Sequence, residues 1–310
     1  MTEFDRSNET NAEISRRLEI INKYYPLDEL VSHGTANSDV ASYYRASEFF
    51  YRHVHAHGGK EIHMGLSADG AYHKEDLLAQ AKFIASLIGE KTERVLEIGA
   101  GALANTGWLC EKFPKVSFSA LDIPGRGFLK KKAGENVKLF EGDYHDLSRF
   151  EPGSFDIVFG VETVCYSADK KKVYSECFRV LKPGGKLVIF DLFEPRPGEE
   201  MTDFEKFVSN VVLASMRVTG SGQYIGDMRS FLREAGFNEP EFEDLTDAIR
   251  PSLKRLERIA GKYFRHPALV KTMRAFISDD ATMNGIAGWL IVLSVEKIHG
   301  YCRLVAEKPL

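Results

Sequence analysis

The feature that most constrains the fold is a short apolar segment that runs directly into a glycine-rich turn. Val95-Leu96-Glu97-Ile98 is followed by Gly99-Ala100-Gly101. The apolar segment predicts a buried strand, and the glycines allow a tight turn and close approach to a ligand. Asp122 follows Gly101 by 21 residues, at the end of the next apolar segment. An acid at this distance can hydrogen-bond ribose hydroxyls, so the pair favours a nucleotide-like cofactor over a merely structural turn.

The order of apolar segments predicts the fold class. Short runs of strand length alternate with helical segments: RVLEIGAG, VSFSALDIP, VKLFEGD, FDIVFGVE and KLVIFDLF. Near-continuous apolar strands separated by helices are typical of a parallel sheet covered on both faces. Two late strands, EPEFEDLT and YCRLVAEKP, follow. We therefore expect an α/β protein with a Rossmann-like, doubly wound sheet that is mostly parallel, with an antiparallel last strand.

The chain divides into a core and two mainly helical parts. We expect an N-terminal helical arm and cap over 1–75, the core over 76–247, a helical insertion or lid over 248–298, and the last strand over 299–310. The first part is predicted to be a mobile polar arm, a helix at 13–25 and an aromatic-rich helix at 38–58. Apolar spacing predicts an amphipathic helix over 75–89, and further helices are expected at 203–216 and 228–237.

Composition excludes several classes. The formal charge is −4 over 310 residues, without the basic surplus of a nucleic-acid-binding protein. No apolar run reaches the roughly 18 residues of a membrane span, and the acidic first 30 residues do not resemble a secretory signal. No zinc signature such as HExxH or CxxC occurs. The scattered cysteines favour a reducing, cytoplasmic location; they are Cys110, Cys165, Cys177 and Cys302. Assembly into a homo-oligomer stays open.

The details of the turn narrow the cofactor. The third glycine of a dinucleotide fingerprint is missing, because Leu103 and Ala104 stand near its place. Glu97 precedes the first glycine by two residues, where a carboxylate suits a ligand with adenosine and a cationic sulfonium. Asp143-Tyr144 closes the third strand, where the aspartate can accept a hydrogen bond from an adenine amino group.

These motifs, in this order, resemble the class I S-adenosylmethionine-dependent methyltransferases. The similarity covers residues 94–192 and includes ExGxG, LD, EGD, FDIV and RVLKPGGKLVI. It implies S-adenosylmethionine as cofactor. The residues that would contact its methionine, ribose and adenine parts are Tyr44, Gln80, Glu97, Gly99, Gly101, Asp122, Ile123, Asp143, Tyr144 and Val161.

A second resemblance, over residues 38–195, is to the branch that holds sterol, tocopherol and prenyl-diphosphate C-methyltransferases, with cyclopropane fatty acid synthases as more distant relatives. It rests on SYYRASEFFYRHVHAHGGKEIHMGL, AQAKFIASLIG and GVETVCYSADKKKVYSECFRVLKPGGKL. The resemblance implies that an aromatic helix, an HxG motif and a glutamate after the fourth strand close over the methyl group. The matching positions are Tyr44, His63, Gly65, Gln80 and Glu162.

Several of these residues also have an ordinary structural interpretation. The aromatic residues at 43–51 can be core, and His63 can cap a turn. His53, His55 and His57 alternate near Arg52 and Lys60, as at a solvated helix end or an anion-binding patch. Residues 248–275 hold eight Lys and Arg against one acid, Glu257. Such a segment is a solvated helix face, or it attracts an anionic substrate or a membrane surface.

We expect carbon methylation of an alkene in a small-molecule isoprenoid, through a carbocation. Glu162, Tyr44 and His63 are the catalytic candidates. Arg45 replaces an aspartate that is common in relatives, so the favoured acceptor is a prenyl diphosphate accompanied by Mg²⁺. The residues predicted to bind it are Arg45, Tyr51 and His57. Three alternatives stay open: an O- or N-methyltransferase of a small natural product, a sterol or quinol C-methyltransferase, and a non-catalytic protein that binds the adenosyl ligand.

Overall fold

The computed structural model describes all residues except 1–2, 35–39, 51–59, 125–131, 219–222 and 296. At its centre is a seven-stranded sheet with the strand order β3-β2-β1-β4-β5-β7-β6. The strands are β1 (Arg94–Ile98), β2 (Ser117–Asp122), β3 (Val137–Glu141), β4 (Phe155–Val161), β5 (Leu181–Phe193), β6 (Glu241–Asp244) and β7 (Gly300–Glu307).

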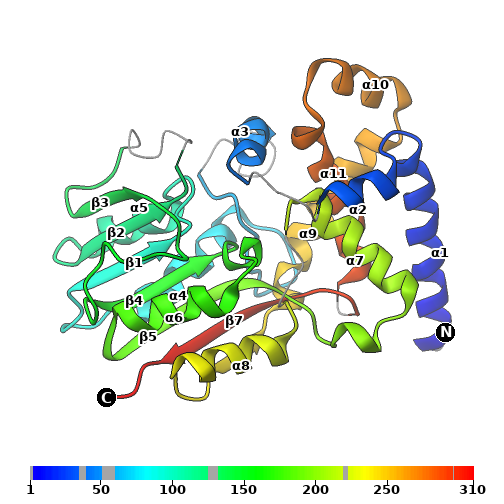
Figure 1. Ribbon diagram of the computed structural model, residues 1–310. Coiled ribbons are helices and arrows are strands. Elements are labelled where there is room, and N and C mark those ends of the chain that lie inside the picture. The colour runs from blue at the N-terminus through cyan, green and yellow to red at the C-terminus, as the bar shows by residue number, and fades with distance from the viewer. Residues whose placement is uncertain (1–2, 35–39, 51–59, 125–131, 219–222, 296) are drawn as a thin grey trace.

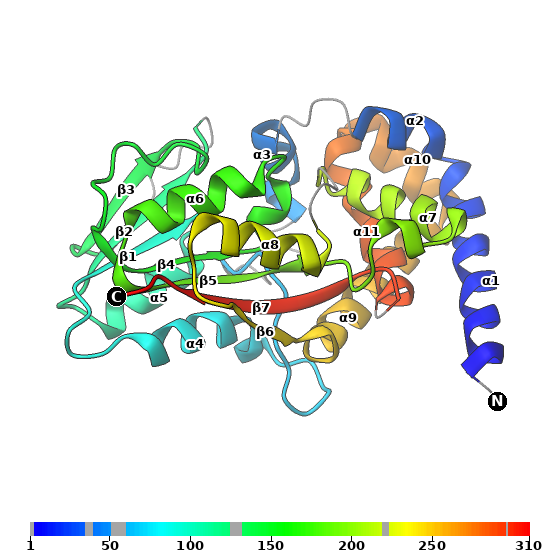
Figure 2. The same ribbon diagram turned by 60° about the horizontal axis from the view of Figure 1, so that its bottom comes forward.

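The pairing confirms the predicted doubly wound sheet. Strands β1 to β5 pair in parallel, whereas β7 is antiparallel to both β5 and β6. The helices α4 (Ala79–Leu87) and α5 (Ala104–Lys112) lie on one face of the sheet, and α6 (Lys170–Val180) and α8 (Ile225–Ala235) lie on the other (Figure 2). The strand order reverses between β1 and β4, which is where ligands bind in open sheets of this kind.

A helical body stands at one end of the sheet (Figure 1). It contains α1 (Glu3–Asn22), α2 (Leu27–Gly34), α7 (Asp203–Ser215), α9 (Thr246–Phe264), α10 (Pro267–Phe276) and α11 (Asp279–Ser294), while α3 (Val40–Phe50) lies between this body and the sheet. Helices α9 to α11 connect β6 to β7. That residues 248–298 act as an insertion or lid stays a prediction. Among the described residues, no helix has the length and apolarity needed to cross a bilayer.

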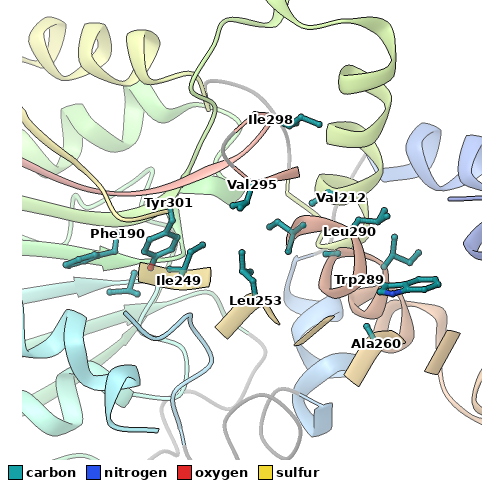
Figure 3. Packing of buried hydrophobic residues seen from close by; sticks show 14 of the residues in the cluster. Phe190, Val212, Ile249, Leu253, Ala260, Trp289, Leu290, Val295, Ile298 and Tyr301 are labelled. Carbon is teal, nitrogen blue, oxygen red and sulfur yellow. The ribbon is translucent and has the colours of Figure 1, made fainter. Parts of the chain in front are cut away.

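The helical body is held to the core by one continuous apolar cluster (Figure 3). Ile249 and Leu253 on α9 lie near Tyr301 of β7, and Trp289 of α11 stacks on Phe264 with ring centroids 5.0 Å apart. Arg17 of α1 is buried against this cluster, where it pairs with Glu257 at 2.5 Å and lies over the Trp289 ring. The cluster fixes α9 and α11 relative to the sheet.

Three sequence predictions need correction. The N-terminal arm is helical from Glu3 onward, where the sequence predicts a mobile polar arm. The predicted turn Leu181–Gly185 belongs to β5, which absorbs it through a shift of register against β4. The expected helix over 75–89 is split into a 3₁₀ segment, Lys74–Leu78, followed by α4. Two further 3₁₀ segments lie at Val164–Tyr166 and Gly198–Glu200.

Candidate functional site

A cavity of about 630 Å³ lies beyond the carboxyl ends of β1, β2 and β4 and continues between the helices α9, α10 and α11. Its wall therefore has two parts. The sheet end is lined by the glycine-rich turn, Asp122, Asp143 and Glu162, whereas the helical end is lined mainly by apolar side chains. These are Ile249, Leu253, Leu256, Ile259, Leu269, Met273 and Ile291. A volume of this size suits a cofactor together with a small acceptor.

The glycine turn is shaped so that side chains are excluded from it. Gly99 has φ +66°, and a Cβ added there would lie 1.8 Å from the Thr163 hydroxyl. Gly101 has φ +51°, and Leu103 adopts the left-handed conformation immediately before α5. Backbone amides that precede a helix attract polar or anionic ligand groups. Glycine is required here for both its conformation and its small size.

Two buried carboxylates flank this turn. Glu97 accepts hydrogen bonds from the side-chain amide of Asn105 at 3.2 Å and from the backbone amide of Thr106 at 3.1 Å. Burial raises the pKa of Glu97 to about 7. Asp122 accepts from the Gly101 amide at 2.6 Å and from the Ile123 amide at 2.7 Å. Both carboxylates line the cavity. They place negative charge where a cationic sulfonium ligand and its ribose hydroxyls would lie.

The third strand contributes a hydrogen-bonded relay at the cavity wall. The Asp143 carboxylate contacts His145 Nδ1 at 2.5 Å, and His145 Nε2 lies 2.7 Å from the Ser167 hydroxyl. Tyr144 packs against His145 and donates from its hydroxyl to the Thr163 carbonyl at 3.1 Å. The relay orients Asp143 at the edge where an adenine amino group is expected. Ser167 is fully buried, so the three residues do not form an accessible nucleophile.

Glu162 is the most constrained residue of the site. It follows β4 with φ +49°, a conformation that is uncommon for a residue other than glycine. Its amide donates to the Phe190 carbonyl at 2.7 Å, and its carboxylate accepts from the Met64 amide at 2.7 Å. Burial raises the pKa of Glu162 to about 7, and the nearby Asp191 charge adds to the shift. A strained, partly buried carboxylate in a cavity is typical of a functional group.

Tyr44 and His63 complete the sheet end of the cavity. The Tyr44 hydroxyl donates to Tyr166 at 3.0 Å, and their rings meet edge to face at 5.7 Å. His63 is buried, and burial lowers its pKa. An imidazole with a lowered pKa is neutral at physiological pH, and this neutral form can accept or relay a proton.

The remaining predicted residues have other surroundings. Gln80 is buried behind the cavity wall and donates to the Met64 carbonyl at 2.7 Å, so it holds the segment that contacts Glu162. Its direct contact with the cofactor stays a prediction. Arg45 is exposed, bonds to Ser42, and is not among the cavity-lining residues. Tyr51 and His57 lie outside the described residues. Gly65, in the HxG motif, packs against Asp76 and Leu77.

Sequence reasoning missed the groups that surround Glu162. Tyr301 on β7 lines the cavity, and burial raises its pKa well above the ordinary value. Asp191 and Tyr166 also line the cavity. Asp191 stands at the end of the apolar run KLVIFD, and this position beside the ends of the other parallel strands was the available signal. No local pattern marks Tyr301, because the fold brings it there from the end of the chain.

The residues present fit S-adenosylmethionine. Two buried polar atoms at the cavity, Asn105 Oδ1 and His63 Nε2, have no hydrogen bond of good geometry in the described part of the chain, although these two side chains approach each other. Unpaired buried polar atoms are costly unless a ligand or water satisfies them. Together with the glycine cradle and the two flanking carboxylates, they supply acceptors for a ligand that carries an amine, hydroxyls and a positive charge. Except for Gln80, every predicted cofactor-binding residue lies on this one cavity.

Comparison with known proteins agrees with this arrangement. Residues 96–189 match the family described as "Methyltransferase domain". The chain is 32% identical to 27-O-demethylrifamycin SV methyltransferase from Amycolatopsis mediterranei, over 56% of this chain and 64% of that protein. The chain spans less than two thirds of the length of this and the other first curated relatives.

Solved structures show the same fold. A putative sarcosine dimethylglycine methyltransferase from Galdieria sulphuraria superposes with TM-score 0.66 and 23% identity, covering 85% of this chain and 98% of that chain. Geranyl diphosphate C-methyltransferase from Streptomyces coelicolor, solved with Mg²⁺, geranyl diphosphate and S-adenosylhomocysteine, superposes with TM-score 0.57 and 14% identity, covering 91% and 97%. At identities of 23% and 14%, these superpositions establish only a shared fold. The two proteins are named for different acceptors.

Proposed function

We propose that this chain, which carries a class I S-adenosylmethionine-dependent methyltransferase domain, methylates an alkene carbon of an isoprenoid. One observation carries the proposal. A single cavity joins the cofactor cradle, the strained and partly buried Glu162 carboxylate, and a mainly apolar region between α9, α10 and α11. The apolar region suits a hydrocarbon acceptor, because burial of apolar surface is the main source of its affinity.

The proposed chemistry divides the work among this chain's residues. The cofactor would supply an electrophilic methyl group. Glu97 and Asp122 would hold the cofactor. Attack by the alkene on the methyl carbon would form the new carbon–carbon bond, break the sulfur–methyl bond with release of S-adenosylhomocysteine, and leave a carbocation on the acceptor. The rings of Tyr44 and Tyr166 stabilise this cation by about 0.5–2 kcal/mol each. The Glu162 carboxylate adds charge stabilisation and then takes a proton from the neighbouring carbon, which restores an alkene.

The finer proposal is that the acceptor is a prenyl diphosphate. Two lysines, Lys60 and Lys262, line the cavity and can bind its anionic head group. The described residues contain no cluster of three His, Cys, Asp or Glu side chains suited to a metal ion. Any Mg²⁺ would therefore accompany the diphosphate as part of the substrate. The similarity in fold to geranyl diphosphate C-methyltransferase supports testing this class first.

O-methylation of a natural product is a second candidate. The raised pKa of Glu162 favours it, because such a group suits a general base for an acidic hydroxyl. The similarity to 27-O-demethylrifamycin SV methyltransferase and to the O-methyltransferase cnsE also favours it. The acceptor need then form no cation. N-methylation has support only from the names of other relatives, because a buried anionic cage for an amine is not evident in the apolar part of the cavity.

The deciding experiment is an acceptor screen with isotopically labelled S-adenosylmethionine. The panel contains prenyl diphosphates with and without Mg²⁺, sterols, quinols, phenolic natural products and small amines. Mass spectrometry and carbon NMR of the product distinguish a C-methyl from an O-methyl group. A labelled C-methyl prenyl diphosphate supports the favoured proposal, whereas an O-methyl product supports the second candidate. Cofactor binding with no product from any acceptor class counts against both.

A further inference from the structure

A stripe of basic side chains runs along the exposed face of α9. Lys254, Arg258, Lys262 and Arg265 are all exposed, and their spacing of four, four and three residues places them on one side of the helix. Within the part of the chain that the structure describes, no carboxylate forms an ion pair with any of these four. Glu257, the single acid in this stretch, is turned toward Arg17 of α1. The exposed face of α9 is therefore cationic from Lys254 onward, whereas Asp247, exposed in the first turn of the helix, pairs with Arg250 at 3.2 Å.

An apolar face of α10 begins at the cavity and ends in solvent. Leu269, Met273 and Phe276 follow one another at i, i+4 and i+7, which places them on one side of the helix. Leu269 and Met273 line the cavity, whereas Phe276 does not and is 85% exposed. On the neighbouring α9, the cavity-lining Ile259 is 37% exposed. These side chains mark a mouth of the cavity between α9 and α10, with the basic stripe beside it.

We propose that the α9–α10 edge docks on an anionic lipid bilayer, and that the acceptor enters the cavity from this membrane surface. The inference rests on the proposed function, because an apolar acceptor of this kind partitions into membranes. Charge complementarity selects the partner: the stripe meets lipid phosphates while the exposed aromatic ring enters the interface. A nucleic acid would use the cations equally well, but it offers no apolar phase for Phe276 and the rim residues.

Charge contacts at the membrane surface can give measurable binding without deep insertion of the protein into the bilayer. A basic residue near an anionic membrane surface strengthens partitioning by about fivefold. Removing three of them should weaken it by roughly a hundredfold, and added salt should do the same by screening. Loss of the Phe276 ring should weaken binding to the anionic vesicles, and the binding that remains should keep its dependence on salt.

The experiment measures co-sedimentation of the full chain with phosphatidylcholine vesicles, with and without phosphatidylglycerol. The test variant is Lys254→Gln/Arg258→Gln/Arg265→Gln, none of which lines the cavity. The matched control removes the same charge from the exposed residues Lys82, Lys91 and Lys115, each replaced by Gln. Lys91 and Lys115 precede β1 and β2, at the edge of the sheet opposite the cavity. Phe276→Ser forms a third arm, and thermal melts check that each variant is folded.

The proposal expects binding only to the anionic vesicles, a roughly hundredfold loss in the test variant, and little change in the control. Equal losses of vesicle binding in both triple variants would show that only net charge matters, and would overturn the docking proposal. The proposal would also be overturned if the protein bound no vesicles, or if it bound a DNA oligonucleotide and no vesicles. Turnover of a detergent-dispersed acceptor separates the two proposals. If that turnover is intact without vesicle binding, docking fails; if vesicles bind and no acceptor is methylated, the proposed function fails.

Discussion

Replacing Glu162 with Gln tests the centre of the proposed mechanism. The amide keeps the shape of the side chain and can still accept the hydrogen bond from the Met64 amide, but it carries no charge and takes no proton. Positioned general bases contribute about 10²–10⁴-fold to rate. We therefore expect turnover to fall at least a hundredfold. The dissociation constant for S-adenosylmethionine should barely change, because a charge that acts on the developing cation lowers the barrier without binding the ground state.

The pH dependence makes this test sharper. Burial raises the pKa of Glu162 to about 7, and the proposed mechanism uses its carboxylate form. Turnover of the wild type at saturating substrates should rise with pH, with a midpoint near 7, so that the rate at pH 6 is about one tenth of the plateau. The Gln variant should lose this midpoint. Asp191→Asn is the matched control: burial still raises the Glu162 pKa, but the variant removes the smaller contribution of the Asp191 charge, so the midpoint should shift downward while the plateau persists.

The same pKa predicts a gain in stability for the Gln variant. A carboxyl whose pKa is 4.5 when unfolded and about 7 when folded is destabilising once it ionises. The cost appears between pH 4.5 and 7 and is constant above pH 7, where it amounts to about 3 kcal/mol at most. Glu162→Gln should therefore be more stable than the wild type at pH 8 and equal to it at pH 4, as measured by urea denaturation. A variant that is less stable at both pH values, or one that retains turnover, would refute the reasoning.

Three further substitutions test other parts of the site and fold. Gly99→Val should lower cofactor affinity by more than about a hundredfold in calorimetry, because its Cβ would overlap the Thr163 hydroxyl; equal affinity would exclude this turn as the binding element. Arg17→Ala should cost about 2–4 kcal/mol in urea denaturation, since it removes a buried pair with Glu257. Tyr44→Phe keeps the ring and loses one hydrogen bond, so steady-state turnover should fall less than tenfold; a much larger fall would assign the hydroxyl itself a chemical role.

That the proposed cofactor-binding residues line one cavity could be predicted, because they follow consecutive strands. Glu97, Asp122 and Asp143 stand at the ends of apolar segments, and parallel strands bring those ends to one edge of the sheet. The acceptor end has no comparable signal. Ile259 and Met273 appear in the sequence as apolar positions of amphipathic helices, which predicts burial but not burial around a cavity. Only the packing of α9, α10 and α11 decides which of these positions face it.

Glu162 also shows how the fold couples the N-terminal segment to the proposed chemistry. A residue other than glycine in the left-handed region costs about 1–2 kcal/mol, so Glu162 needs partners that fix it. One partner is the sheet, through the Phe190 carbonyl, and the other is the Met64 amide, far away in sequence. Met64 is in turn held by Gln80, whose amide also reaches the Tyr301 hydroxyl at 3.4 Å. Gln80 therefore positions the carboxylate through Met64, which gives a physical reason for this residue without direct contact to the cofactor.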